Sequence, residues 1–165
     1  MKLETVFRVR AAIPADLPAL LALDEAAPAA AHWSEAEYRR LFTKDTGRVT
    51  LVIEGDYVQG FVVGRDLGPE WEIENMVVAD TARRRGLGER LVGELLGLAS
   101  SRGAQTVFLE VRESNGAARR LYSKMGFNEI GCRRSYYRHP EEDALLYEKI
   151  VTPGTRKSVE AGKGL

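Results

Sequence analysis

A basic, glycine-containing turn between an apolar strand and an amphipathic helix constrains this chain most. Residues 75–91 read NMVVADTARRRGLGERL, which places the turn 83–88 at a helix N-terminus. Unpaired backbone N–H groups and the positive end of the helix dipole favour an anion there. Two glycines let the backbone approach a bulky phosphate, and three arginines add forked donors. The turn therefore predicts a pyrophosphate site.

The turn alone does not identify the ligand. A dinucleotide fingerprint needs a third glycine, and Leu91 stands at that position. A Walker loop needs Gly-Lys-Ser or Gly-Lys-Thr, which the chain lacks. A solvated helix start that packs tightly would use the same glycines, so other motifs have to decide between the two interpretations.

Composition describes an ordinary globular chain. Among 165 residues, 24 are basic and 24 acidic, so the formal net charge is zero and we expect no specific nucleic-acid partner. Cys132 is the single cysteine, so no intrachain disulfide forms. With His32 and His139 it has no recognisable metal-ligand spacing, and we expect no metal. The chain begins without a signal-peptide run and has no membrane-spanning stretch, which predicts a cytoplasmic protein. We expect a monomer or homodimer.

Hydrophobic periodicity and turn residues predict the element order strand, two helices, three strands, helix, strand, helix, two strands. The expected strands are 6–10, 49–54, 58–65, 71–78, 107–111, 127–134 and 143–150, and the expected helices are 14–26, one capped by Ser34, 87–101 and 115–125. This pattern predicts a mixed α/β (α+β) sheet in a single domain, 1–151. The polar, glycine-rich segment 152–165 is expected to be a disordered tail.

A carboxylate interrupts the strand 107–111, which otherwise reads as buried on both faces. Burying the charge of Glu110 is costly unless another group pairs with it or the chemistry uses it. Glu110 would be useful there as a general base. The alternative is that it is a strand-end glutamate whose side chain reaches water. Glu72 and Glu74 share one face of strand 71–78 by parity and are further candidates for the base.

The helix 115–125 carries the third motif. Tyr122 lies on one helical stripe with Leu121 and Met125, which is also the pattern of a core tyrosine. Asn115 fits the N-cap and can contact a ligand as well. Gly126 stands where a left-handed C-cap is expected.

Together these three motifs resemble the GCN5-related N-acetyltransferase (GNAT) family. Its acetyl-CoA motif is Arg or Gln, two residues, Gly, one residue, then Gly or Ala, and residues 83–88 fit it. Within the family, segments 109–115 and 121–127 are similar to the bacterial ribosomal-protein-alanine N-acetyltransferases, as are 33–35, 133–137 and 142–144. The resemblance covers about residues 5–150 and implies a GNAT-like sheet of about seven strands with about four helices.

The resemblance implies acetyl-CoA as the donor, a bulge in the strand before the turn, Glu110 as the general base and Tyr122 as the general acid. The residues it implies for cofactor binding are Met76, Val77, Val78, Arg83, Arg84, Arg85, Gly86, Leu87, Gly88, Glu89, Asn115 and Tyr122. Those expected to bind the acceptor substrate are Trp33, Glu74 and Tyr137. We expect no nucleophilic role for Cys132.

The activity implied is acetyl transfer to the N-terminal α-amine of a protein, a ribosomal protein starting with Ala, by direct attack in a ternary complex. An α-amino pKa of about 7.7–8.0 is within reach of a carboxylate base, and a tyrosine hydroxyl with a pKa of about 10 can protonate the leaving thiolate. Three alternatives stay open: acetylation of a small-molecule amine or a lysine, a non-catalytic acyl-CoA-binding module, and an RNA- or ribosome-associated protein.

Overall fold

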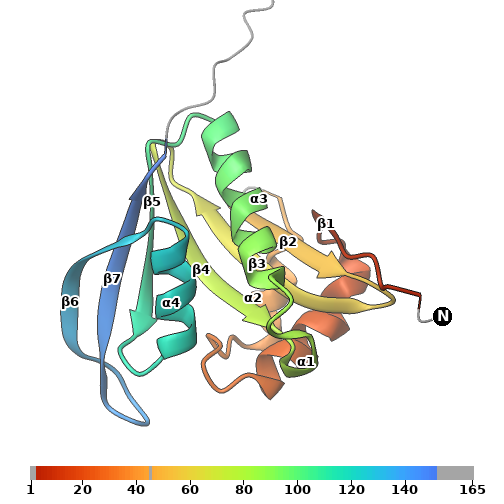
Figure 1. The fold of residues 1–165 in the computed structure, drawn as a ribbon, viewed down its shortest axis with the longest axis horizontal. Coiled ribbons are helices and arrows are strands. Elements are labelled where there is room, and N and C mark those ends of the chain that lie inside the picture. Colours follow the sequence, from red (N-terminus) through yellow and green to blue (C-terminus); the bar gives the residue numbers. More distant parts are fainter. Residues whose placement is uncertain (1–2, 45, 152–165) are drawn as a thin grey trace, which may run out of the picture.

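The computed structural model describes residues 3–44 and 46–151, which form a seven-stranded mixed sheet with helices on both faces (Figure 1). The strand order is β1-β2-β3-β4-β5-β7-β6. The strands are β1 (Arg8–Ala11), β2 (Arg48–Glu54), β3 (Val58–Asp66), β4 (Glu70–Val78), β5 (Thr106–Arg112), β6 (Asn128–Tyr137) and β7 (Glu142–Ile150). The helices are α1 (Leu17–Ala26), α2 (Glu35–Arg40), α3 (Leu87–Ser101) and α4 (Gly116–Lys124), with 3₁₀ turns η1 (Pro14–Asp16) and η2 (Asp80–Ala82). The predicted fold class is confirmed, and the predicted tail 152–165 lies outside the described residues.

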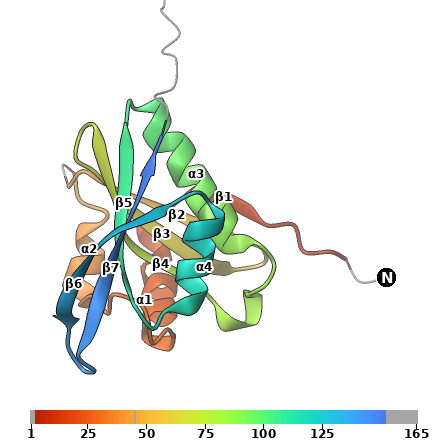
Figure 2. The ribbon, with the colours of Figure 1, turned by 60° about the vertical axis from the view of Figure 1, so that its left-hand side comes forward.

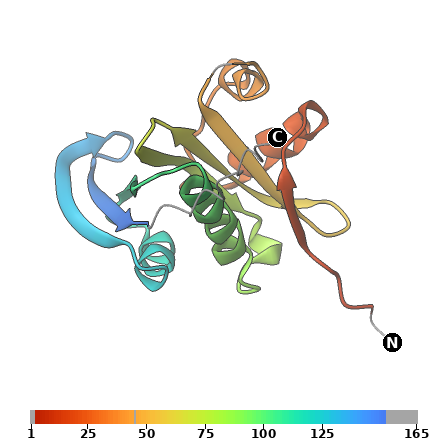
Figure 3. The ribbon, with the colours of Figure 1, turned by 90° about the horizontal axis from the view of Figure 1, so that it is seen from above.

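Two apolar layers hold the helices to the sheet. Seen from above, α1 and α2 cover one face, and α3 and α4 cover the other (Figure 3). Leu91 and Leu95 of α3 pack with Trp71 in the first core, while Tyr38 of α2 and Phe61 of β3 belong to the second. Burying each side chain of the size of leucine or phenylalanine stabilises the fold by about 1.5–3 kcal/mol. The layers therefore make the sheet a rigid support for the loops at its edges.

The sheet opens between its two parallel strands. β4 and β5 pair only from Glu70–Ile73 with Thr106–Leu109, and beyond these residues they separate (Figure 1). On the edges of β4 and β5 that face each other, the backbone groups past the last pair have no partner strand, so they are available to a ligand. The opening lies at the carboxyl ends of both strands.

A β-bulge lies in β4 just where this opening begins. The β3–β4 register steps from Gly64↔Ile73 to Val63↔Asn75, which leaves Glu74 as the extra residue. Before the bulge, Ile73 points to the α3 side of the sheet, and after it Met76 does, so the side-chain alternation reverses. Such a bulge re-aims the end of a strand. The bulge that the resemblance implied for this strand is confirmed.

The expectation that strand 107–111 is buried on both faces is wrong. Val107, Leu109 and Val111 are buried, but Phe108 and Glu110 are only partly buried. The reason is that neither hydrophobic core covers this face of β5, and at Glu110 the face borders the opening between β4 and β5. The predicted helix 14–26 also begins with the 3₁₀ turn η1 before α1 starts.

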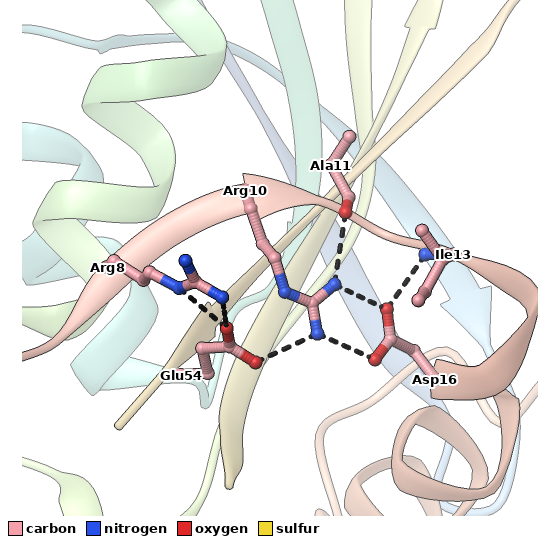
Figure 4. Close-up of polar contacts among 6 residues, drawn as sticks. All are labelled: Arg8, Arg10, Ala11, Ile13, Asp16 and Glu54. Carbon is pink, nitrogen blue, oxygen red and sulfur yellow. Dashed lines mark hydrogen bonds and ion pairs between the residues drawn. The ribbon is translucent and has the colours of Figure 1, made fainter. Parts of the chain in front are cut away.

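A charged cluster fastens the edge strand β1 (Figure 4). The Arg10 guanidinium donates to both oxygens of Asp16, at 2.8 and 2.9 Å, and to Glu54 Oε2 at 2.9 Å. Arg8 donates to Glu54 Oε1 at 2.7 Å, and Asp16 also accepts from the backbone N–H of Ile13 at 2.8 Å. Hydrogen bonds from Arg10 and Arg8 lower the pKa of Glu54 to about 2. The cluster therefore ties β1 to β2 and to the start of the first helix.

Candidate active site

A first cleft, of about 650 Å³, opens between the turn 83–88, the start of α4 and the loop after α1. The predicted cofactor residues that line it are Met76, Val77, Val78, Arg83, Arg84, Gly86, Leu87, Gly88, Glu89 and Asn115. Arg85 does not line it, because its guanidinium lies 5.9 Å from the centre of the Phe7 ring. Tyr122 lines the adjoining cleft instead. We call this first space the cofactor cleft.

The start of α3 has the backbone that a pyrophosphate site needs. Gly86 occupies the N-cap position at φ 71°, in the left-handed region where a side chain would be strained, and no side chain caps the helix there. The first N–H groups of this fifteen-residue helix are thus left for an anion. Arg83 and Arg84 are both exposed at its rim, with Arg83 3.0 Å from Asp80. These donors fit the pyrophosphate of a coenzyme A group.

Two further residues shape the floor of the cofactor cleft. A Cβ added at Gly88 would lie 3.3 Å from Leu121 Cδ2, so this glycine allows α3 and α4 to approach closely. Asn115 caps α4 by accepting from the Ala118 N–H at 3.1 Å, which confirms the predicted N-cap. Asn115 and Ala118 both line the cofactor cleft and the adjoining one. They therefore stand at the junction of the two.

A second cleft, of about 660 Å³, continues from this junction into the opening between β4 and β5. Met76, like Asn115, lines both clefts. The remaining predicted site residues line this second space: Trp33, Glu72, Glu74, Glu110, Tyr122 and Tyr137. The structure thus brings together, from four different elements and one loop, residues that lie more than 100 positions apart in the chain. We call this second space the acceptor cleft.

Two of its three carboxylates are paired with arginines. Glu74, at the bulge, accepts from Arg48 at 2.7 and 3.2 Å, and its side chain is 11% exposed. Glu110 on β5 pairs with the Arg133 Nε at 3.0 Å; Arg133 is 59% exposed, and Glu110 is 16% exposed. A largely solvated arginine contributes little attraction, so the Glu110 pair is the weaker of the two.

Glu72 is different, since it makes no hydrogen bond or ion pair with any residue that the structure describes. Its side chain is partly buried on the face that borders the acceptor cleft. Burial, with the charges of Glu74 and Glu110 nearby, raises the pKa of Glu72 above its ordinary value. A cation entering the cleft would relieve this mutual repulsion.

Tyr122 lies at the inner wall of the acceptor cleft. Its side chain is buried, its ring meets Phe127 edge-on at 5.4 Å between centroids, and its hydroxyl faces Met76 Sδ at 3.9 Å. Burial raises the pKa of the Tyr122 hydroxyl above its ordinary value, so the hydroxyl stays protonated at neutral pH. Tyr122 is therefore a core residue, as its helical stripe predicted. Its hydroxyl is at the same time a proton donor beside Met76, where the two clefts meet.

Aromatic side chains wall the acceptor cleft from two directions. Trp33 comes from the loop before α2, with the Arg48 guanidinium 5.4 Å from its ring centre. Tyr137 comes from the end of β6, with the Arg112 guanidinium 4.2 Å from its ring centre. Figure 2 shows the β6–β7 hairpin that carries Tyr137 at the lower left of the molecule. Burial and the Glu110 charge raise the pKa of Tyr137.

The sequence did not predict some of the residues that line the clefts. Pro28, Ala29 and Ala30 line both clefts, but small apolar side chains in a loop carry no chemical signal. Arg120 lines the cofactor cleft and Arg112 the acceptor cleft. Parity on β5 places Arg112 on the Glu110 face, so that signal was available.

The single cysteine lies outside both clefts, whereas His32 and His139 line the acceptor cleft. Cys132 is exposed on β6, with its Sγ 3.8 Å from Asp143, and burial and Asp143 raise its thiol pKa. In residues 3–44 and 46–151, no three His, Cys, Asp or Glu side chains are arranged to hold a metal. No helix in this described part has the length and apolar character to cross a membrane.

The comparison with protein families decides the class of enzyme. Residues 17–127 match the model described as the acetyltransferase (GNAT) family. The chain belongs to the GNAT family. It is therefore an N-acetyltransferase, and acetyl-CoA is its acetyl donor.

Known members of the family are similar along most of the chain. The ribosomal protein bS18-alanine N-acetyltransferase of Salmonella typhimurium is 35% identical over 136 residues, which cover 79% of this chain and 88% of that protein. The Haemophilus influenzae protein of the same name is 39% identical over 89 residues, 54% of this chain and 60% of that one. The crystal structure of the Escherichia coli ribosomal-protein-S18-alanine N-acetyltransferase superposes with a TM-score of 0.80 at 27% identity, covering 92% and 98% of the two chains.

Proposed function

We propose that this GNAT enzyme acetylates the N-terminal α-amine of a protein, with a ribosomal protein that begins with alanine as its acceptor. The observation that carries the proposal is the junction at Met76 and Asn115, where a cofactor cleft and a separate acceptor cleft meet. The names of the bacterial relatives support the choice of acceptor. We place the enzyme in the cytoplasm, as a monomer or homodimer in which residues 1–151 form the catalytic domain.

On this proposal the coenzyme A group is held by the α3 start and by the backbone of Met76, Val77 and Val78. The exposed guanidinium groups of Arg83 and Arg84 would bind the pyrophosphate, and Asn115 would bind the pantetheine arm. Bound there, acetyl-CoA supplies an activated thioester carbonyl. Positioning of the two reactants accounts for much of the acceleration in a direct transfer of this kind.

The acid and base roles follow from the charges in the acceptor cleft. Glu72, which has no partner among the described residues, attracts the incoming α-ammonium. Glu110 removes the proton that the amine must lose, directly or through a water. Tyr122, kept protonated by burial, donates to the sulfur as the thiolate leaves. Trp33 from the loop before α2 and Tyr137 from the end of β6 hold the peptide segment behind the α-amine.

The acidic lining also favours a second candidate acceptor. Glu72, Glu74 and Glu110 border one space, and such a cluster would attract a cationic small molecule or a lysine side chain as well. A lysine ε-amine, with a pKa of about 10.4, is harder to deprotonate than an α-amine. The α-amine is therefore the better match to a carboxylate base.

The test is acetyl transfer to a panel of acceptors, read by mass spectrometry. The panel holds peptides with free N-termini starting with Ala, Ser or Met, N-blocked lysine peptides and a few polyamines. The proposal expects acetylation of free α-amines, fastest for Ala. Transfer confined to polyamines or lysine would overturn it in favour of the second candidate.

A further inference from the structure

A buried polar network joins three elements behind the acceptor cleft. Tyr38 on α2 is fully buried, and its hydroxyl donates to Asp24 Oδ2 on α1. The same hydroxyl accepts from Asn75 Nδ2 on β4 at 3.0 Å. Asp24 is 3% exposed and Asn75 is 6% exposed. A carboxylate buried this deeply is costly unless donors surround it, so the network is satisfied only in one arrangement.

The network extends from these side chains to the backbone of one loop. Asp24 Oδ1 accepts from the His32 N–H at 3.1 Å, and Asn75 Oδ1 accepts from the Ala31 N–H at 3.3 Å. His32 has φ 52°, in the left-handed region that residues other than glycine seldom adopt. Its ring contacts the same Asp24 oxygen at 3.1 Å and the Pro28 carbonyl at 3.2 Å. Side chains of the network thus hold the loop in a strained conformation that it would not keep alone.

The loop 27–33 is a wall of both clefts. Pro28, Ala29 and Ala30 line the cofactor and acceptor clefts, and Trp33 lines the acceptor cleft. At the other end of the network, Asn75 directly follows the bulge and precedes Met76, which stands at the junction. The network therefore connects a wall of the acceptor cleft to the strand that borders the cofactor.

We infer that Asp24, Tyr38 and Asn75 are positioning residues that set the width of the acceptor cleft through the loop 27–33. Neither Asp24 nor Tyr38 lines a cleft, so both act only through the loop and Asn75. The inference rests on the proposed function, because the width matters for a protein N-terminus that enters beside Trp33. A network that served core stability alone would leave acceptor binding unchanged when weakened.

The test weakens the network without emptying the core. Tyr38→Phe removes one hydroxyl and keeps the ring that packs near Trp33 and Phe61. The matched control is Tyr147→Phe, because Tyr147 is also buried, is hydrogen-bonded by Arg119 at 3.3 Å and lines neither cleft. Asp24→Asn, which removes the charge, is the second network variant. Hydrogen exchange of segment 27–33, the KM values for acceptor and acetyl-CoA, kcat and Tm are measured for each.

Loss of a buried partner predicts about fivefold to tenfold higher acceptor KM and about tenfold faster exchange of segment 27–33 in Tyr38→Phe. The KM for acetyl-CoA should rise less than the acceptor KM, because the loop also lines the cofactor cleft but the pyrophosphate site at the start of α3 is untouched. Asp24→Asn should act in the same direction, and Tyr147→Phe should change neither KM nor exchange.

Network variants that lower only Tm, with wild-type exchange in segment 27–33 and wild-type acceptor KM, would overturn the inference. If the wild-type enzyme acetylates no free N-terminus, the proposed function fails by itself. The exchange measurement needs no acceptor, so it would still decide whether the network holds the loop.

Discussion

The carboxylates at the β1 edge differ from Glu72 and Glu110 in the acceptor cleft in how fully arginines of the protein neutralise their charge. At the edge, Glu54 accepts hydrogen bonds from two arginines, and Asp16 accepts one from each of the two Nη atoms of Arg10. In the acceptor cleft, Glu110 has one ion pair to the exposed Arg133, and Glu72 has no partner among the described residues. The first group holds an edge strand in place, whereas the second keeps capacity for a positively charged acceptor.

The largest effect is expected from neutralising the proposed base. Glu110→Gln should lower kcat about 100-fold or more, because general base catalysis contributes about 10²–10⁴-fold. The KM for acetyl-CoA should change by less than about twofold, since Glu110 does not line the cofactor cleft. Steady-state kinetics at saturating acetyl-CoA measure both. Glu129→Gln, on exposed β6, is the control and should behave as wild type.

Glu72→Gln is the companion variant, and it distinguishes the role of Glu72 from that of Glu110. We expect a higher acceptor KM with kcat near normal, because Glu72 attracts the α-ammonium without taking its proton. If instead Glu110→Gln keeps the full rate across neutral pH and Glu72→Gln loses it, the base is Glu72 and the assignment of roles is reversed.

A carboxylate placed in the cofactor cleft should weaken acetyl-CoA binding. Gly86→Asp adds backbone strain at φ 71° and a negative charge beside the proposed pyrophosphate site. Gly86→Asn adds a side chain of the same shape without the charge, and Asn tolerates the left-handed region better than most residues. Calorimetry should give Gly86→Asp a Kd for acetyl-CoA about tenfold above that of Gly86→Asn, a difference of about 1.4 kcal/mol. Equal Kd values for the two variants would place the pyrophosphate elsewhere.

The smallest effect is expected at the β1 edge, and it concerns stability. The pKa of Glu54 is about 2 in the folded protein, against an ordinary value of 4.5. A lowered folded-state pKa means that the charged form stabilises the fold above about pH 4.5 and that this contribution is lost as the pH falls toward 2. The Tm of wild type should therefore exceed that of Glu54→Gln near pH 5, and the gap should shrink toward pH 2.

Thermal melts of the two proteins across this pH range make the measurement, with activity at neutral pH as the control. Activity should stay near wild type, because Glu54 lines neither cleft. A Tm gap that does not change with pH would mean that the cluster contributes through packing and not through its charge.

Local signals explain why the elements were predictable from the sequence. The capping box of Ser34 and Glu37 forms at 2.7 and 3.2 Å and starts α2. Gly126 has φ 87° after α4, as its position predicted. These features depend on a few neighbouring residues, so they can be recognised without knowing the rest of the fold.

The acceptor cleft could be predicted only in part, because tertiary register decides it. The sequence motifs pointed to Glu110, Tyr122 and Asn115 as site residues, and all three line the acceptor cleft. The separation of β4 from β5 and the pairing of Glu74 with Arg48 follow from how distant strands align. Arg85 was grouped with the cofactor residues for its position in the motif, yet it turns toward Phe7. Neighbours along the chain do not reveal which way such a long side chain points.

The most direct test uses one peptide that offers both kinds of amine. A peptide with a free N-terminal alanine and an internal lysine is incubated with the enzyme and acetyl-CoA, and fragment spectra locate the acetyl group. We expect acetylation of the α-amine alone, and no reaction once that amine is blocked. Acetyl on the lysine, at an equal rate in the blocked peptide, would contradict it.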